Sequence, residues 1–231
     1  MNALNKYKIY PLGDSAAVID LGNLISPALN NKILSMQQWL RQHSFRGLKD
    51  VIVAYSSLTL QYDPFIIYND TNQGYKWINQ YLEKCFNESG DHSPEIRNVS
   101  IPVCYELGHD LEEISTAKGL SVEEIIFIHS SLTYRVYMLG FLPGFAYMGT
   151  VDQRIAMPRK TQPREKVEAG SVGIAGWQTG IYPLDSPGGW QIIGRTPLKL
   201  FDAQAQTPAL LRPGDEVSFH SISLNEFQTW R

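Results

Sequence analysis

The sequence predicts an α+β protein of two domains, a small N-terminal α/β domain over residues 1–90 and a β-rich domain over residues 91–231. Helix-like and strand-like patterns alternate in the first ninety residues, whereas short strands punctuated by glycine and proline follow Thr133. The polar segment NESGDHSPEIRN, residues 87–98, lacks periodicity and separates the two patterns. A chain of 231 residues is long enough for two cores.

The N-terminal domain begins with a predicted hairpin. Strand-like residues 8–10 and 17–20 flank the turn PLGDS. A helix is expected over residues 26–43, where apolar side chains recur at helical spacing. Ser26 can serve as its N-cap, and Pro27 suits the first helical position because its fixed φ matches a helix.

The rest of this domain continues the alternation. Residues 50–55 and 57–62 are predicted strands, and Asp63-Pro64 ends the second. Residues 75–86 show a second amphipathic helical pattern. Together these elements indicate a small α/β sandwich.

The C-terminal domain opens with a strand over residues 99–105 and a pair of helices. The first helix begins at Asp110 and is ended by Gly119. The second begins at Ser121, and Glu124 three residues later completes the spacing of a capping box. The short strands that follow are typical of a barrel or a sandwich.

The composition is that of a soluble globular protein, with 43% hydrophobic and 19% charged residues. A formal net charge of −3 and a pI near 6.0 give no electrostatic reason to expect nucleic acid or an anionic membrane as partner. Apolar runs such as residues 125–128 are too short to span a bilayer, and the N-terminal stretch lacks a secretion signal. We therefore expect a cytoplasmic protein in which Cys85 and Cys104 are free thiols.

Basic residues gather in residues 158–197, which contain seven of the eighteen glycines and five of the thirteen prolines. Arg159 and Arg164 each follow a proline, whose fixed φ stiffens the backbone that presents the guanidinium. Arg195 lies in an otherwise apolar strand, where an arginine usually has a partner or a ligand. Such guanidinium groups suit a bound carboxylate or phosphate, although solvated loop charge explains the first two equally well.

Two glycine-rich segments accompany these arginines, residues 169–173 and 186–190. Exposed backbone N–H groups there can form an anion nest, and Ser171 and Ser186 can donate to a bound oxyanion. Neither serine lies in a G-x-S-x-G elbow, and tight barrel turns account for the glycines at least as well.

A phosphate loop is strongly disfavoured although residues 189–196, GWQIIGRT, have its glycine spacing. Such a loop must lead into the N-terminus of a helix, whereas Trp-Gln-Ile-Ile is strand-like and Pro197 follows directly. Arg195 also stands where the motif has lysine.

The sequence supports a metal site or an acid–base site less well than it supports an anion site. His129 has apolar neighbours on a predicted helix, where a lone histidine is more often a core residue than a base, although we retain it as a candidate ligand. No metal-binding motif occurs, and the glutamates of the two helices suit first-turn positions. The aromatic residues of GFLPGFAYMG, residues 140–149, either pack under a loop or wall a ligand site with Phe145 and Tyr147.

These motifs resemble a known family. GFLPGFAYMG, PRKTQPREKVEAGSVGIAG and QTGIYPLDSPGGWQIIGRTP are similar to the family of the 5-oxoprolinase B subunit, also called KipI or allophanate hydrolase subunit 1. YPLGDSAAVIDLG, SLTLQYDP and CYELGHDLEEIS extend the resemblance over nearly the whole chain. Trp177 departs from the family pattern, which usually has glycine before QTGIYP, and this puts the shape of one wall of the site in doubt.

The resemblance implies a cyclophilin-like β-barrel in the C-terminal half, without implying prolyl isomerase activity. It also implies a role in ATP-dependent 5-oxoprolinase, which opens 5-oxo-L-proline to L-glutamate. The expected partners are a C-type subunit, similar to allophanate hydrolase subunit 2, and an A-type subunit of the LamB/YcsF kind. ATP would be used by the complex, and no metal or organic cofactor is expected in this chain.

The same resemblance assigns expected roles to residues. An ATP-dependent lactamase must hold anionic groups and stabilise developing charge, so Arg159, Arg164 and Arg195 are the predicted catalytic clamp. The predicted substrate-binding residues are Tyr147, Ser171, Gln178, Tyr182, Ser186 and His129.

Two other roles occur in the family. Some members inhibit a sporulation histidine kinase, so a kinase-binding regulator is the alternative function. A carboxyltransferase role, as in urea-processing biotin enzymes, is less favoured because this chain carries no biotin-carrier or carboxylase segment. The density of arginine, glycine, serine and tyrosine exceeds what kinase docking requires, which favours a role within the enzyme.

Overall fold

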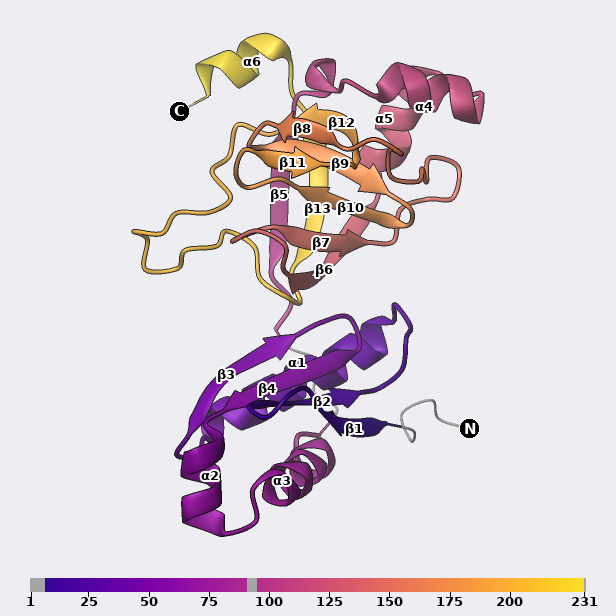
Figure 1. Ribbon diagram of the computed structural model, residues 1–231. Helices are drawn as coiled ribbons and strands as arrows, with labels where there is room; N and C mark the ends of the chain where they lie inside the picture. The colour runs from indigo at the N-terminus through magenta and orange to yellow at the C-terminus, as the bar shows by residue number, and fades with distance from the viewer. Residues whose placement is uncertain (1–6, 91–94, 231) are drawn as a thin grey trace. The chain divides into compact units, whose positions relative to one another are not determined.

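The computed structural model describes residues 7–90 and 95–230 of the protein. The chain divides into two compact units, Met1–Glu95 and Ile96–Arg231 (Figure 1). The predicted division between residues 90 and 91 falls five residues earlier, and residues 91–94 of the predicted linker lie outside the described residues.

The N-terminal unit is a two-layer α/β sandwich, as predicted. Within residues 7–90 it contains a four-stranded antiparallel sheet in the order β1-β2-β4-β3. Helices α1 and α3 pack on the sheet and on each other (Figure 1). The strands are β1 (Lys8–Pro11), β2 (Ala16–Asp20), β3 (Leu48–Val53) and β4 (Ser57–Tyr62), and the helices are α1 (Pro27–Gln42), α2 (Pro64–Thr71) and α3 (Tyr75–Glu88).

Helix α2 was not predicted. Asp63 and Pro64 end β4 as expected, but they also begin this helix, since the Asp63 carboxylate accepts hydrogen bonds from the N–H groups of Phe65 (3.1 Å) and Ile66 (3.3 Å). Among its residues only Ile67 is buried, so α2 lacks the apolar stripe by which helices are recognised in a sequence.

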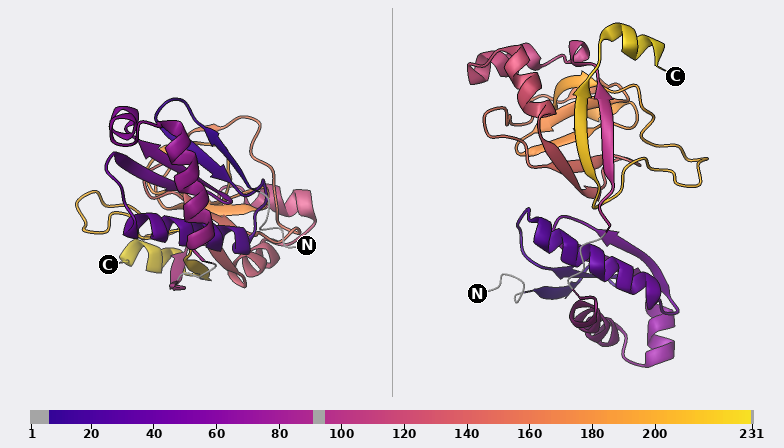
Figure 2. Two further views of the ribbon diagram at one scale, coloured as in Figure 1. Left: turned by 90° about the horizontal axis from the view of Figure 1, so that it is seen from below. Right: turned by 180° about the vertical axis from the view of Figure 1, so that it is seen from behind.

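The C-terminal unit contains the predicted barrel. Within residues 95–230, seven strands form one sheet in the order β12-β9-β10-β7-β6-β13-β5. Neighbouring strands are antiparallel except β13 and β5, which run parallel and lie side by side in the rear view (Figure 2). The strands are β5 (Asn98–Val103), β6 (Thr133–Leu139), β7 (Ala146–Gly149), β9 (Ser171–Ala175), β10 (Gln178–Ile181), β12 (Gln191–Arg195) and β13 (Glu216–Ser221).

A short backbone bridge brings the two edges of this sheet together. Cys104, directly after β5, donates to the carbonyl of Arg195 at the end of β12 (2.8 Å), and Arg195 donates back (3.0 Å). Gly194 permits this approach, because a Cβ there would lie 2.6 Å from a methyl group of Val103. The side chains that point inward form the main core of the unit.

Helices and a second small sheet surround the barrel. The predicted helices are present as α4 (Leu111–Lys118) and α5 (Val122–Ser130), and both halves of the predicted Ser121–Glu124 capping box form. The two-stranded sheet consists of β8 (Arg164–Val167) and β11 (Ser186–Gly188). A 3₁₀ turn η2 (Tyr105–Leu107) and a C-terminal helix α6 (Leu224–Thr229) were not predicted, as both are short.

Other expectations can be compared with the described residues. Cys85 and Cys104 are both free and buried. Among residues 7–90 and 95–230, no helix has the length and apolar character needed to cross a membrane. The same residues include no cluster of histidine, cysteine or carboxylate side chains arranged to hold a metal ion.

Candidate anion site

An aromatic cluster covers the outer face of the barrel, separate from the main core. We call it the outer cluster; it consists of Phe145, Val167, Ala175, Tyr182, Trp190 and Ile192, with Leu142 and Tyr147 packed against it. Alternation along the strands separates the two cores, since Ile181 points inward while Tyr182 points outward. The Phe145 ring meets Tyr182 and Trp190 edge to face, with centroids 5.2 and 5.3 Å apart.

Two glycines let Trp190 lie close against the strands. A Cβ on Gly180 would lie 3.0 Å from Cζ3 of Trp190, and one on Gly173 would lie 3.1 Å from its Cβ. Larger residues at these positions would lift the indole away from the sheet. These strand glycines therefore serve close packing rather than a turn.

Arg159 lies above this indole, with its guanidinium carbon 6.0 Å from the Trp190 ring centroid. Hydrogen bonds fix the backbone on both sides of Arg159: Lys160 N–H donates to Gly189 (2.7 Å), and the Gln191 side chain donates to Pro158 (3.1 Å). Arg159 is exposed, and within the described residues it forms no ion pair or hydrogen bond. Its guanidinium is therefore available to an anion.

Tyr147 and Tyr182 complete the immediate surroundings of Arg159. Burial raises the pKa of both phenols, and the positive charge of Arg159 opposes that rise in each. Tyr147 is half-buried beside Trp190, with ring centroids 5.8 Å apart, whereas Tyr182 is fully buried. We call Tyr147, Arg159 and Trp190 the Arg159 platform. It combines one exposed positive charge with the half-buried ring of Tyr147, above the buried indole of Trp190.

Arg164 is engaged in a different interaction. Its Nη2 donates to Asp110 Oδ1 (2.5 Å), which also receives Lys160 Nζ (2.9 Å). Burial acts to raise the pKa of Asp110, but hydrogen bonds from Arg164, Lys160 and the Ile192 N–H lower it overall, so the carboxylate is ionised. Arg164 thus has a carboxylate partner within the chain.

Arg195 is also paired. Its Nη1 donates to Glu168 (2.5 Å), its Nε donates to the Ala169 carbonyl (2.8 Å), and its guanidinium lies over the Phe227 ring. The structure thus distinguishes the three arginines of the predicted clamp. Arg164 and Arg195 neutralise carboxylates of this chain, and Arg159 alone of the three lacks such a partner among the described residues.

The predicted donors lie at several depths. Gln178, on β10, is half-exposed, and its register places it opposite Gly149, two residues along β7 from Tyr147. Ser171 and Ser186 are buried, and the Ser186 hydroxyl donates to the neighbouring Pro187 carbonyl (3.2 Å). Of these residues Gln178 is the one with both exposure and a position near the Arg159 platform.

His129 is a core residue, which corrects its prediction as a substrate ligand. It is fully buried, and its ring stacks with Tyr134 and Phe219. The Thr179 hydroxyl donates to Gly173 (3.1 Å), so it accepts from His129 Nε2–H (3.1 Å), while Nδ1 accepts from the Tyr105 hydroxyl (2.8 Å). Both ring nitrogens are therefore satisfied inside the core.

The burial of His129 predicts a pH-dependent stability. Desolvation lowers its pKa to about 3, whereas the unfolded chain takes up the proton near pH 6.5. Stability from this group is present above pH 6.5 and falls by about 1.4 kcal/mol per pH unit down to about pH 3. The free energy of unfolding can be measured in urea at pH 7 and pH 5. We expect His129→Gln to be less stable than wild type at pH 7, but its free energy of unfolding should fall less than that of wild type between pH 7 and pH 5. An unchanged dependence of stability on pH in His129→Gln would refute the assignment.

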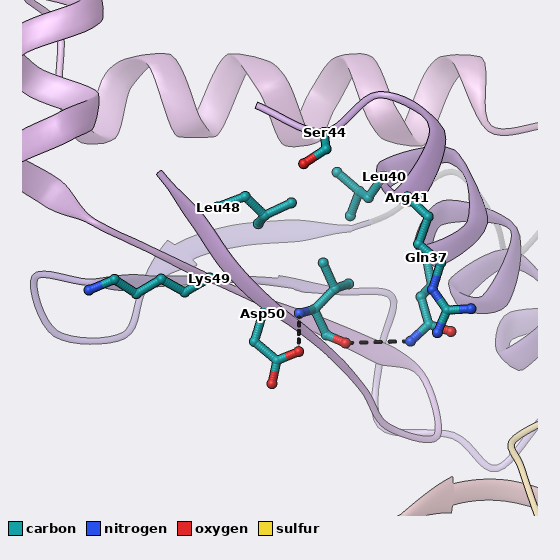
Figure 3. A pocket seen from close by; sticks show the side chains of 8 residues that line it. Gln37, Leu40, Arg41, Ser44, Leu48, Lys49 and Asp50 are labelled. Atoms are coloured by element: carbon teal, nitrogen blue, oxygen red, sulfur yellow. Dashed lines mark hydrogen bonds between the residues drawn. The ribbon is translucent and has the colours of Figure 1, made fainter. Parts of the chain in front are cut away.

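A hollow of about 370 Å³ lies elsewhere, in the N-terminal unit between α1 and the edge strand β3 (Figure 3). Gln37 Nε2 donates to the Val51 carbonyl (3.4 Å), and the Val51 N–H donates to Asp50 (2.7 Å). The Gln37 and Asp50 side chains thus satisfy the hydrogen-bonding groups of the Val51 backbone on the edge strand. No predicted site residue lines this hollow.

Sequence reasoning missed Asp110, Lys160 and Trp190 as parts of the site. Asp110 was interpreted as the start of a helix, and it is the N-cap of α4. Trp190 was interpreted as part of a strand, but it lies at a bend directly before β12, which begins at Gln191. Two features of the sequence could have pointed to these residues. Lys160 directly follows Arg159, and Trp190 stands between Gly189 and a predicted strand. Neither reveals that the two segments lie side by side.

Comparison with known proteins gives a consistent picture. Residues 7–211 match the family described as carboxyltransferase domain, subdomain C and D. The chain is 43% identical to the 5-oxoprolinase B subunit of Bacillus subtilis, covering 98% of this chain and 97% of the relative. It is 38% identical to the 5-oxoprolinase B subunit of Escherichia coli O157:H7, covering 94% and 96%.

A solved structure shares the fold. The crystal structure of TTHA0988 is 36% identical, with a TM-score of 0.79, and the match covers 90% of this chain. The chain spans 40% of the length of that protein.

Proposed function

The chain belongs to the carboxyltransferase domain, subdomain C and D, family, and from this premise we propose that it is the B subunit of an ATP-dependent 5-oxoprolinase. The substrate would be 5-oxo-L-proline, the product L-glutamate, and the active form a complex with a C-type subunit and a LamB/YcsF-type protein. The family predicted from the sequence motifs is confirmed.

One observation carries the proposal for the substrate: the Arg159 guanidinium lies above the Trp190 ring and has no ion-pair partner within residues 7–90 and 95–230. 5-Oxoproline combines a carboxylate with a small five-membered ring. A guanidinium fork suits the carboxylate, and the half-buried ring of Tyr147 suits the apolar face of the lactam. The Arg159 platform thus matches both parts of this ligand.

The chain's contribution would be binding and orientation. Holding the carboxylate at Arg159 fixes the lactam carbonyl relative to a phosphate donor held by the complex, and such positioning lowers the barrier to ring opening. ATP would transfer its terminal phosphoryl group to the lactam oxygen and leave as ADP. Water would then add to the same carbon, the C–N bond would break to free the amine, and a second water would release inorganic phosphate from the new carboxyl group to give glutamate. Gln178, near the platform, is a candidate to orient the lactam amide.

The test is glutamate formation from 5-oxo-L-proline and ATP, measured with the chain alone and mixed with its C-type and LamB/YcsF-type partners. We expect turnover only in the mixture, because Arg159 is exposed to solvent in the single chain and the chain holds no phosphate donor of its own in this proposal. Omission of ATP should abolish product. Folded, co-purifying partners that form no glutamate would contradict the proposal, and inhibition of histidine kinase autophosphorylation by the chain would then favour the alternative.

A further inference from the structure

Asp110 is a buried carboxylate that joins three separate segments of the C-terminal unit. Its side chain is 2% exposed, and although it stands at the N-cap of α4, it makes no capping bond to that helix. Its Oδ2 instead accepts from the Ile192 N–H (2.6 Å), and its own N–H donates to the Ile192 carbonyl (2.9 Å). Asp110 therefore ties the start of α4 to strand β12.

Lys160 connects this carboxylate to the Arg159 platform. Its ammonium bonds Asp110 Oδ1 (2.9 Å) and Glu113 (2.6 Å), and its backbone N–H bonds Gly189, next to Trp190. Since Lys160 follows Arg159 in the chain, its bonds to the buried Asp110 and to Gly189 restrict the backbone that presents the guanidinium. The Glu113 side chain is 55% exposed, so its bond to Lys160 contributes little to this restriction. The Lys160 side chain is 18% exposed, so its contact with Asp110 is shielded from water.

The ion pairs around Asp110 are neutral overall without any contribution from Arg159. Lys160 and Arg164 are matched by Asp110 and Glu113. Arg159, adjacent in sequence to Lys160, forms an ion pair with neither carboxylate, because Asp110 and Glu113 are bonded to Lys160 and Arg164. An arginine that is held in place and unpaired loses less conformational entropy when an anion binds.

We propose that Asp110 is a positioning residue, which acts through Lys160 to hold Arg159 over Trp190 in the orientation that receives a small carboxylate. The proposal rests on the proposed function, because the carboxylate is that of 5-oxoproline. Asp110 does not touch the ligand; it restricts the segment that does.

The kinetic test uses the reconstituted complex with three variants. Lys160→Met disconnects Asp110 from the platform segment while leaving Asp110 bonded to Arg164 and Ile192, so the fold is preserved. It is expected to raise KM for 5-oxoproline about tenfold with kcat within twofold, as lost ground-state orientation predicts. Asp110→Asn should raise KM at least as much, whereas Glu113→Gln, which removes only the exposed partner of Lys160, should leave it unchanged.

Coupling to Arg159 separates positioning from a general structural effect. If Asp110 acts through Lys160 on Arg159, adding Lys160→Met to Arg159→Ala raises KM no further. Independent effects that multiply in the double variant, or a wild-type KM in folded Lys160→Met, would overturn the proposal.

A second measurement does not depend on activity. The indole N–H resonance of Trp190, assigned with Trp190→Phe, reports the guanidinium above it. Arg159→Ala and Lys160→Met in the full chain are expected to shift this resonance in the same direction, and Glu113→Gln should not. If the wild-type complex makes no glutamate, the proposed function fails, and the indole shift alone decides whether Asp110 and Lys160 position Arg159. An unshifted Trp190 resonance in Lys160→Met would refute the positioning role of Asp110 and Lys160.

Discussion

Replacement of Arg159 with alanine is expected to lower kcat/KM of the reconstituted complex about 100-fold. A hydrogen bond to a charged group contributes about 1.5–3 kcal/mol, and each 1.4 kcal/mol corresponds to about tenfold. Arg159 has no ion pair within the described residues, so its removal leaves no buried charge behind, and the thermal unfolding midpoint should be unchanged. The loss would therefore be one of ligand recognition rather than of folding.

Two matched variants sharpen this result. Arg195→Ala removes the same type of side chain from the same domain, but one already bonded to Glu168, so a smaller loss of activity is expected. Arg159→Lys keeps the charge without the planar fork and should be intermediate. If Arg195→Ala were the more damaging change and Arg159→Ala stayed within threefold of wild type, the Arg159 platform would not be the carboxylate site.

Gly170→Ala is expected to produce the largest loss of stability, roughly 2–5 kcal/mol, because left-handed backbone costs an L-residue about 1–2 kcal/mol and overpacking about 1–3 kcal/mol. Gly170 has a φ of +84°, and a Cβ there would lie 2.3 Å from the Thr196 carbonyl oxygen. Thr196 also donates its N–H to the Gly170 carbonyl (2.9 Å), so the two backbones cannot separate without losing this bond. Urea unfolding of the C-terminal unit would measure the difference.

Gly176→Ala is the control for backbone conformation. Gly176 has a φ of +59°, but a Cβ added there meets nothing within 4 Å. It should cost about 1–2 kcal/mol, the backbone contribution alone. Equal losses in the two variants would show that the close approach at Gly170 contributes nothing.

The secondary structure was predictable where local chemistry determines it. The Ser121–Glu124 capping box, the helix start at Pro27 and the end of α4 at Gly119 all depend on residues within one turn of each other. Helix α2 was missed for a physical reason, since Phe65 and Tyr68 are exposed and a single buried residue produces no periodic pattern. Of the two glycines in residues 169–173, Gly170 has the positive φ that a turn requires, whereas Gly173 allows Trp190 to pack closely.

The sequence by itself determined the family, the two-domain α+β architecture and the segment that carries the arginines, since motifs and periodicity are properties of contiguous residues. Only the tertiary structure decided which arginine is available. Glu168 and Asp110 lie 27 and 54 residues from the arginines that they pair with, and a sequence does not show which carboxylate folds against which guanidinium. Ion pairing depends on distances of a few ångströms between side chains remote in the chain, so the availability of Arg159 and the burial of His129 both follow from how the barrel closes.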